Sequence, residues 1–151
     1  MTAACREACC NVTPRLTVAE LFERGFRRNR ETPLAIEGQL CTGPEDNTAS
    51  FSLDAADGKI AAVGFRASCC ATLIAYCEFI VQIAPGFRFE IARGLTAQNL
   101  IEGLPGMPAL KRDRALLAIA AFRSALIEAA AESSTFPRHP EVAERSKALE
   151  G

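Results

Sequence analysis

The chain has 151 residues, of which 49% are hydrophobic and 23% are charged. This length fits one domain, which would bury roughly 68–70% of the surface of its unfolded chain. The apolar and charged fractions are typical of globular proteins and exclude global disorder. The net charge of −1 and the pI near 5.9 argue against a nucleic-acid-binding protein, because phosphate contacts need a basic excess.

Neither a membrane span nor a secretory signal is expected. The longest apolar run, Ala115 to Phe122, has eight residues, whereas a spanning helix needs roughly 18. Arg6 and Glu7 interrupt the N-terminus before the apolar core of a signal peptide could form. We therefore expect a cytoplasmic protein with reduced thiols, and metal or sulfur chemistry rather than a disulfide framework. The seven cysteines are Cys5, Cys9, Cys10, Cys41, Cys69, Cys70 and Cys77.

The first third of the chain predicts an arm, a helix and a strand. Residues 1–13 are Cys-rich without a clear period and are expected to form a mobile arm. Apolar residues recur at helical spacing from Val18 to Phe26, with Thr17 as N-cap. The basic run ERGFRRNR is expected to be a solvated helix end, where cations suit the helix dipole. The alternation from Leu34 to Leu40 predicts a strand with Leu34, Ile36 and Leu40 on one face.

Two further strands follow at short intervals. Phe51, Leu53 and Ala55 alternate with polar residues, and Asp57-Gly58 is a hairpin-turn signal that leads into a strand from Ile60 to Phe65. Consecutive strands with short connections indicate an antiparallel arrangement. We therefore predict an α+β fold, a three-stranded antiparallel β-meander packed against helices.

Helical patterns fill the rest of the domain. A helix is predicted from Cys69 to Ala84, ended by Pro85-Gly86. Residues 87–91 are expected to be extended, and Thr96 caps a short helix that ends near Gly103. After a turn at residues 104–108, a long amphipathic helix is predicted from about Ala109 to Glu132. The domain would thus span residues 14–132, and residues 133–151 would form a flexible tail.

Cysteines fall at two places that a meander brings together. Cys41 follows the first strand, and Cys69 and Cys70 lie at the start of the helix after the third strand. These positions share one edge of the sheet. A helix N-terminus favours the thiolate, the form that binds iron or accepts sulfur. Cys77 lies on the apolar stripe of the same helix and is interpreted as core packing.

The stretch GKIAAVGFRASCCATLIAYCEFI, followed by LTAQNLIEGLPGMPALKRDRALLAIAAF, resembles the NifU/IscU-type scaffold domain of iron–sulfur cluster assembly. The resemblance runs from about Leu34 to Leu126. It implies that Cys41 and Cys70 match the first and second cluster cysteines, with Cys69 in place of a glycine. Asp46, or Glu45, matches the carboxylate of the site. Leu104-Pro105 and Pro108 to Lys111 resemble the loop before the last helix.

The sequence departs from the family at the third ligand. Where the family has a His-Cys pair, this chain has Asp113 and Arg114, and the single histidine, His139, lies in the tail. Cys69, Cys77, Asp46, Asp113 and the N-terminal cysteines remain as candidate additional ligands. Arg114 is expected either to reach water, to pair with Asp46 or Glu45, or to act as a fixed cation for sulfide, persulfide or a partner carboxylate.

The resemblance implies a non-enzymatic scaffold that binds iron or a nascent Fe–S cluster (or zinc as isolated) through Cys41 and Cys70 and hands it to acceptors. The implied partners are a cysteine desulfurase, apo Fe–S acceptor proteins and a chaperone, without nucleic acid or membrane. Two alternatives stay open. One is a divergent adaptor or regulator of the desulfurase that holds no cluster, and the other is a SufE-like persulfide relay.

Overall fold

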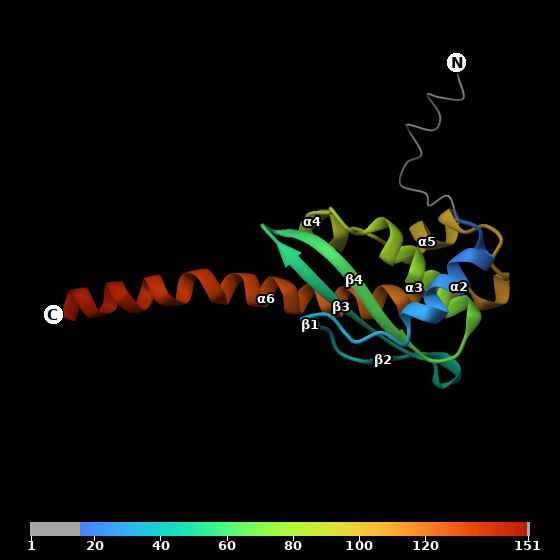
Figure 1. The fold of residues 1–151 in the computed structure, drawn as a ribbon, viewed down its shortest axis with the longest axis horizontal. Coiled ribbons are helices and arrows are strands. Elements are labelled where there is room, and N and C mark those ends of the chain that lie inside the picture. Colours follow the sequence, from blue (N-terminus) through green and yellow to red (C-terminus); the bar gives the residue numbers. More distant parts are fainter. Residues whose placement is uncertain (1–15, 151) are drawn as a thin grey trace, which may run out of the picture.

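The structure is a computed structural model that describes residues 16–150, with side chains described for residues 16–132. The predicted arm, residues 1–13, lies outside the described residues. In the described part, an antiparallel sheet of four strands carries helices on one face (Figure 1), so the predicted α+β fold is confirmed.

The centre of the sheet is a long hairpin. Strand β3, Thr48–Ala56, pairs antiparallel with β4, Lys59–Ala67. Asp57 and Gly58 connect the two strands with φ angles of 57° and 75°. Positive φ at both central residues is what a tight hairpin turn requires, so the predicted Asp-Gly turn is confirmed.

The predicted strand from Leu34 to Leu40 is instead two short strands. β1, Ile36–Glu37, and β2, Cys41–Thr42, both pair with β3, along the edge that β4 leaves free. A Cβ built on Gly38 would lie 2.5 Å from the backbone nitrogen of Ala125, so the chain here presses directly on a helix. The chain leaves the sheet at this contact, and Leu40 is 64% exposed rather than on the core face.

Two helices, α2 and α3, pack against each other. α2, Val18–Arg28, begins with a capping box in which the Thr17 hydroxyl accepts from Glu20 N and the Glu20 carboxylate accepts from Thr17 N, which confirms the predicted cap. α3, Ala71–Ile83, begins two residues later than the predicted helix. It is buried on nearly every face because α2, β4 and the last helix, α6 (Asp113–Glu150), all contact it.

The connection after α3 differs from the predicted extended stretch. Only the start of it is extended, where the Ile60 N–H donates to the carbonyl of Phe87. α4, Phe89–Arg93, then turns Phe89 and Ala92 into the core. Burial of these two residues three apart favours a helical turn over a strand. The next helix, α5, Ala97–Gly103, has the predicted cap at Thr96.

The last helix, α6, Asp113–Glu150, begins four residues later than predicted, after a short η2 turn at Ala109–Lys111. It crosses the sheet and extends beyond it (Figure 1). Its backbone is helical through the residues that were predicted to form the tail. No helix in the described part of the chain combines the length and the apolar character needed to span a membrane.

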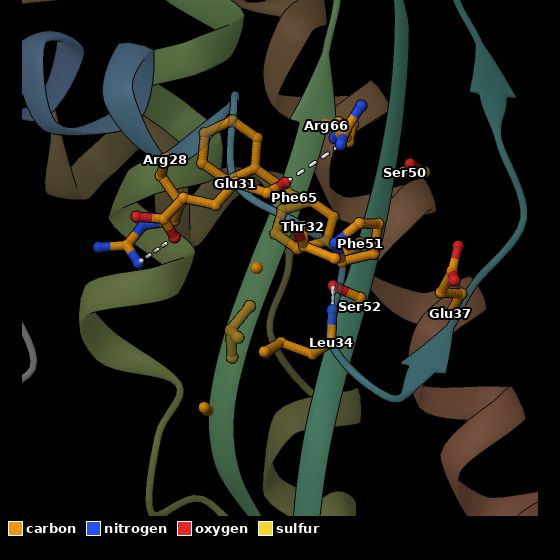
Figure 2. Close-up of a pocket in the computed structure, with 14 residues that line it drawn as sticks. Arg28, Glu31, Thr32, Leu34, Glu37, Ser50, Phe51, Ser52, Phe65 and Arg66 are labelled. Atoms are coloured by element: carbon orange, nitrogen blue, oxygen red, sulfur yellow. Dashed lines mark hydrogen bonds and ion pairs between the residues drawn. The ribbon is translucent and has the colours of Figure 1, made fainter.

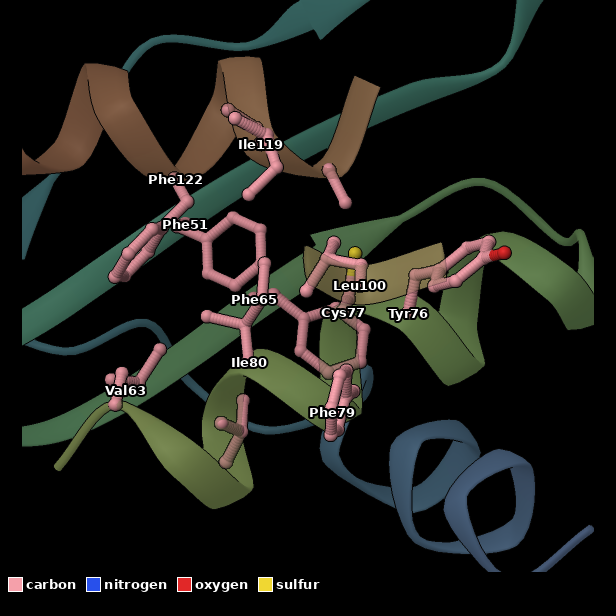
Figure 3. Close-up of a cluster of buried hydrophobic side chains, with 14 of the residues drawn as sticks. Phe51, Val63, Phe65, Tyr76, Cys77, Phe79, Ile80, Leu100, Ile119 and Phe122 are labelled. Carbon is pink, nitrogen blue, oxygen red and sulfur yellow. The ribbon is translucent and has the colours of Figure 1, made fainter. Parts of the chain in front are cut away.

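The core lies between the sheet and helices α3 and α6. Phe51 of β3 contacts Phe65 of β4 and Phe122 of α6, with ring centroids 5.9 and 5.5 Å away (Figure 3). Cys77 is fully buried in this cluster, which confirms its interpretation as a packing residue. The core therefore fixes the start of α3, the start of α6 and the end of the sheet relative to one another.

Candidate functional site

The strand register places Cys41 and Cys70 at the same end of the sheet. Cys41 of β2 pairs with Ala49 of β3, and Ala49 pairs with Ala67 of β4. Two strand spacings separate Cys41 from Ala67, about 10 Å. Cys70 follows Ala67 by three residues. The edge at which the sequence predicted the thiols to meet is therefore the edge where both are found.

The side chain of Cys41 lies on the helix-covered face of the sheet. Residues opposite each other in an antiparallel pair point to the same face, and the partner Ala49 is fully buried there. Cys41 is half-buried and packs against the core. Behind it, Gly43 brings the chain close to Leu117 of α6, where a Cβ would come within 3.1 Å of that side chain. The loop after Cys41 therefore packs against the first turns of α6.

Cys70 is the N-cap residue of α3, and hydrogen bonds fix the backbone around it. Its N–H donates to the carbonyl of Ser68, and its own carbonyl accepts the first helical bond, from Ile74. Ser68 is fixed in turn, since its hydroxyl accepts from Thr48 N and donates to Oδ1 of Asn47. The Cys70 side chain makes no capping hydrogen bond. The backbone therefore holds Cys70 in place, and its sulfur does not cap the N–H groups of α3.

Cys69 differs from its neighbour. It is exposed and precedes α3, whereas Cys70 is half-buried. A molecule in solution can therefore reach the Cys69 sulfur directly, whereas protein partly covers the Cys70 sulfur.

Arg114, on the first turn of α6, brings a positive charge to Cys70. Its guanidinium donates to Glu45 of η1 (Pro44–Asp46) at 2.6 Å and to Asp113 at 2.8 Å. Hydrogen bonds to Asp113, Cys70 and Glu45 raise the pKa of Arg114 above its ordinary value. Only 5% of Arg114 is exposed. The expectation that this side chain reaches water is therefore wrong, and the expected pairing with Glu45 is confirmed.

The carboxylate of this loop that pairs with Arg114 is Glu45 and not Asp46. Asp46 is exposed and makes no ion pair within 4.0 Å in the described part of the chain. Both residues have left-handed backbones, with φ of 59° and 60°. Such conformations cost free energy in residues other than glycine. The Glu45–Arg114 pair is one of the contacts that offset this cost in the loop that carries Cys41.

The surroundings of two candidate additional ligands, Cys77 and Asp113, disfavour metal binding. Burial, together with the charges of Glu78 and Cys70, raises the pKa of the Cys77 thiol well above 9.0, so it stays protonated. Asp113 is bound to Arg114. Among the described residues, no group of three or more His, Cys, Asp or Glu side chains is arranged to hold a metal ion. Cys5, Cys9 and Cys10 lie outside the described residues, and the side chain of His139 is not described.

One hollow among the described residues lies away from these cysteines. A cavity of about 340 Å³ opens between residues 31–37 and strands β3 and β4 (Figure 2). Its lining contains neither cysteine nor histidine. This hollow therefore offers no thiol chemistry. The candidate site remains the end of the sheet that carries Cys41 and Cys70, which we call the thiol edge.

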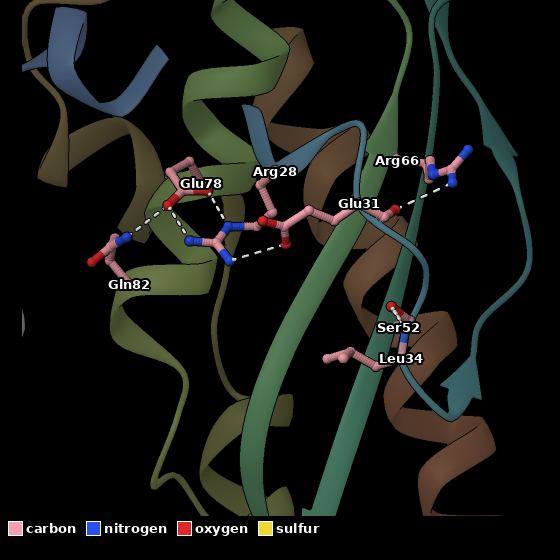
Figure 4. A network of polar contacts seen from close by, with 7 residues as sticks. All are labelled: Arg28, Glu31, Leu34, Ser52, Arg66, Glu78 and Gln82. Carbon is pink, nitrogen blue, oxygen red and sulfur yellow. Dashed lines mark hydrogen bonds and ion pairs between the residues drawn. The ribbon is translucent and has the colours of Figure 1, made fainter. Parts of the chain in front are cut away.

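A cluster that the sequence analysis missed lies beside this cavity. Arg28 was expected in a solvated helix end, but it donates to the buried Glu78 at 2.7 and 3.1 Å, and Gln82 donates to the same carboxylate at 2.6 Å (Figure 4). A glutamate in the middle of an apolar helical run was the available signal, since buried charges need partners.

Comparison with protein families identifies the domain. The model of the NifU-like N terminal domain matches residues 45–134, more than half of the chain. The chain belongs to the NifU-like N-terminal domain family. Domains of this family generally serve as non-enzymatic scaffolds in iron–sulfur cluster assembly and bind iron or Fe–S clusters. A comparison with curated proteins gives no match.

The family match and the geometry bear on different parts of this NifU-like domain. The match includes Glu45, Cys70 and Arg114 and begins after Cys41. The register of β2 on β3 is what brings Cys41 to the same edge. Arg114 stands where the resemblance puts the third cysteine of the family, and it is in contact range of Cys70.

Proposed function

We propose that this NifU-like domain holds iron or a nascent Fe–S cluster, as cargo, between Cys41 and Cys70 and passes it to apo acceptor proteins. The observation that carries the proposal is the strand register, because it brings Cys41 of β2 to the same end of the sheet as the last residue of β4, which Cys70 follows by three residues. Sulfur would come from a cysteine desulfurase, the partner that the family resemblance implies.

The ligand count points to a cargo that is held loosely. Fe–S clusters usually take about four protein ligands, mostly thiolates. Cys41 and Cys70 supply two, Cys77 is buried and protonated, and Arg114 occupies the position of a third cysteine. Further ligands would come from Cys69, from a small thiol or from the acceptor itself. A cluster bound in this way leaves easily, which suits transfer.

The loop before α6 is the proposed contact for a chaperone. Leu110, at its end, is 94% exposed, and an apolar side chain presented to solvent on a short turn is available to a partner. Leu110 lies four residues before Arg114, so a partner bound here would sit next to the thiol edge.

A sulfur relay is the second candidate function. It is favoured by the exposed Cys69 next to Cys70 and by the cation at Arg114, an arrangement suited to receiving a persulfide. The adaptor alternative is favoured by the missing third thiolate, since a domain without a complete ligand set could still bind the desulfurase.

One reconstitution experiment separates these functions. The full-length protein is incubated anaerobically with ferrous iron, cysteine and a cysteine desulfurase, and iron, sulfide and visible absorption are measured. We expect a chromophore that is lost in both Cys41→Ser and Cys70→Ser and kept in Cys77→Ala, the matched control at a buried cysteine.

The other outcomes would contradict the scaffold. Persulfide on a single cysteine without bound iron supports the relay. Absence of both signals, with desulfurase binding intact, supports the adaptor.

A further inference from the structure

The charges around Cys70 are distributed in an unusual way, with the cation buried and its partners in water. The Arg114 side chain is 6% exposed, whereas those of Glu45 and Asp113 are 73% and 37% exposed. Nε of Arg114 is buried and has no hydrogen-bond partner among the described residues. A guanidinium carries more N–H donors than these two carboxylates occupy. Arg114 therefore has donor capacity to spare beside the Cys70 sulfur.

We propose that Arg114 is a positioning residue for sulfur: its guanidinium binds the anionic terminal sulfur of a persulfide on Cys70, and Glu45 is the partner that this sulfur displaces. The inference rests on the proposed function, in which Cys70 receives sulfur for cluster assembly. It assigns to the residue at the third-cysteine position a role of its own, in holding sulfur rather than iron.

The chemical step is a sulfur transfer without net oxidation or reduction. The Cys70 thiolate attacks the terminal sulfur of a donor persulfide, R–S–SH. A new S–S bond forms at Cys70, the S–S bond of the donor breaks, and the donor leaves as R–S⁻. The resulting Cys70–S–SH loses its proton to solvent, and the terminal sulfur then carries the negative charge that Arg114 binds. Hydrogen bonds to charged partners are the stronger ones.

Glu45 is the partner suited to exchange. Its side chain is mostly in water, so the carboxylate is hydrated when it leaves Arg114 and the incoming sulfur anion replaces it as the partner of the buried cation. Its backbone φ of 59° stores strain that a rearranged loop would release. Asp113 is adjacent in sequence to Arg114 and stays beside it. Arg114 itself is enclosed by protein, so the cation remains in place while Glu45 swings out.

The test measures sulfur on individual cysteines of the full-length reduced protein. The protein is equilibrated without oxygen with a fixed ratio of cysteine persulfide to cysteine, then alkylated, and fragment-ion mass spectrometry assigns each persulfide. Cys69 serves as the internal reference because it is exposed to the same concentration of cysteine persulfide. In Arg114→Met, the Cys70 to Cys69 persulfide ratio is expected to fall about tenfold, the value of one charge-assisted hydrogen bond.

Two further variants make the result specific. Arg114→Lys keeps the positive charge but lacks the planar guanidinium. We expect its Cys70 to Cys69 persulfide ratio to lie between those of Arg114→Met and the parent protein. Glu45→Gln removes the competing carboxylate while leaving Arg114 in place, and the ratio is expected to rise severalfold. Arg112→Gln, at an exposed arginine two residues away, is the matched control and should leave the ratio unchanged.

An unchanged ratio in folded Arg114→Met, or a fall in Glu45→Gln, would overturn the inference. The reconstitution described above is run in parallel on the same preparations. Suppose that bound iron and sulfide still depend on Cys41 and Cys70, but that the persulfide ratio is the same with and without Arg114. The inference then fails and the scaffold function stands. If neither signal depends on these cysteines, the proposed function fails, and the inference with it.

Discussion

Two arginine–carboxylate clusters in this molecule have opposite burial. On α2 and α3 the acid is inside: Glu78 is 0% exposed, and Arg28 reaches it from the surface (Figure 4). At the start of α6 the base is inside, and Glu45 and Asp113 meet Arg114 from the solvent side. The thiol next to Glu78, Cys77, is fully buried, whereas the thiol next to Arg114, Cys70, is half-buried.

The difference shows which partner of each pair is fixed and which can be exchanged. Removing the outer partner of a buried charge strands that charge without water, whereas removing the inner partner lets the outer one hydrate. The Arg28–Glu78 pair joins two helices, and its loss would affect the fold. The Arg114 cluster holds a cation at the thiol edge with replaceable anions, an arrangement that suits binding.

The largest effect is expected from Arg28→Met. This change leaves the carboxylate of Glu78 buried with only Gln82 as a hydrogen-bond donor. We expect a loss of about 3 kcal/mol in the free energy of unfolding, measured by urea denaturation. Glu31→Gln is the control, because Glu31 meets Arg28 only at 3.9 Å and from an exposed position. If the two variants were equally stable, the buried pair would not join α2 to α3.

Arg114→Met is expected to cost clearly less than Arg28→Met. The carboxylates that it leaves behind are exposed and regain water, while methionine keeps the apolar stem of the arginine packed. We expect the melting temperature to stay within a few degrees of the parent, measured by circular dichroism. A loss as large as that of Arg28→Met would mean that Arg114 is a structural residue and that the two clusters do not differ.

Thiol reactivity gives a smaller and position-specific prediction. Burial first, then the charges of Glu78 and Cys70, raises the pKa of Cys77, so this thiol stays protonated in the folded state above pH 9.0. In the unfolded chain it ionises there, and folding stability from this group is therefore lost as the pH rises through 9.0 and beyond.

Alkylation of the native protein should follow exposure. Cys69 is expected to react first and Cys77 only on unfolding, measured by mass spectrometry as a function of pH. Rapid native labelling of Cys77 would contradict the packing of the core around α3.

Local signals predicted much of the fold. The hairpin turn at Asp57-Gly58 and the caps at Thr17 and Thr96 depend on residues close in sequence, and the structure has all three. The break in the first strand was not predictable in this way. It depends on Gly38 meeting Ala125, residues far apart in the chain whose approach only the packed structure reveals.

The candidate site was predictable in outline and not in its charges. A meander places the ends of its first and third strands together, so the shared edge of Cys41 and Cys70 followed from topology. The choice of Glu45 over Asp46 as partner of Arg114 depends on two left-handed residues in one loop, which no periodicity indicates. The site roles that stay predictions are those of Cys41, Cys70, Asp46, Cys69, Asp113 and Arg114.

The central claim is that position 114 faces the same cargo as Cys41 and Cys70, and the Arg114→Cys variant tests it most directly. Iron per protein is measured after anaerobic reconstitution and desalting, in the parent and in the variant. A third thiolate at this position should raise the retained iron and sulfide clearly above the parent. Equal iron in the two proteins would contradict the account, because it would mean that residue 114 does not face the cargo bound at the thiol edge.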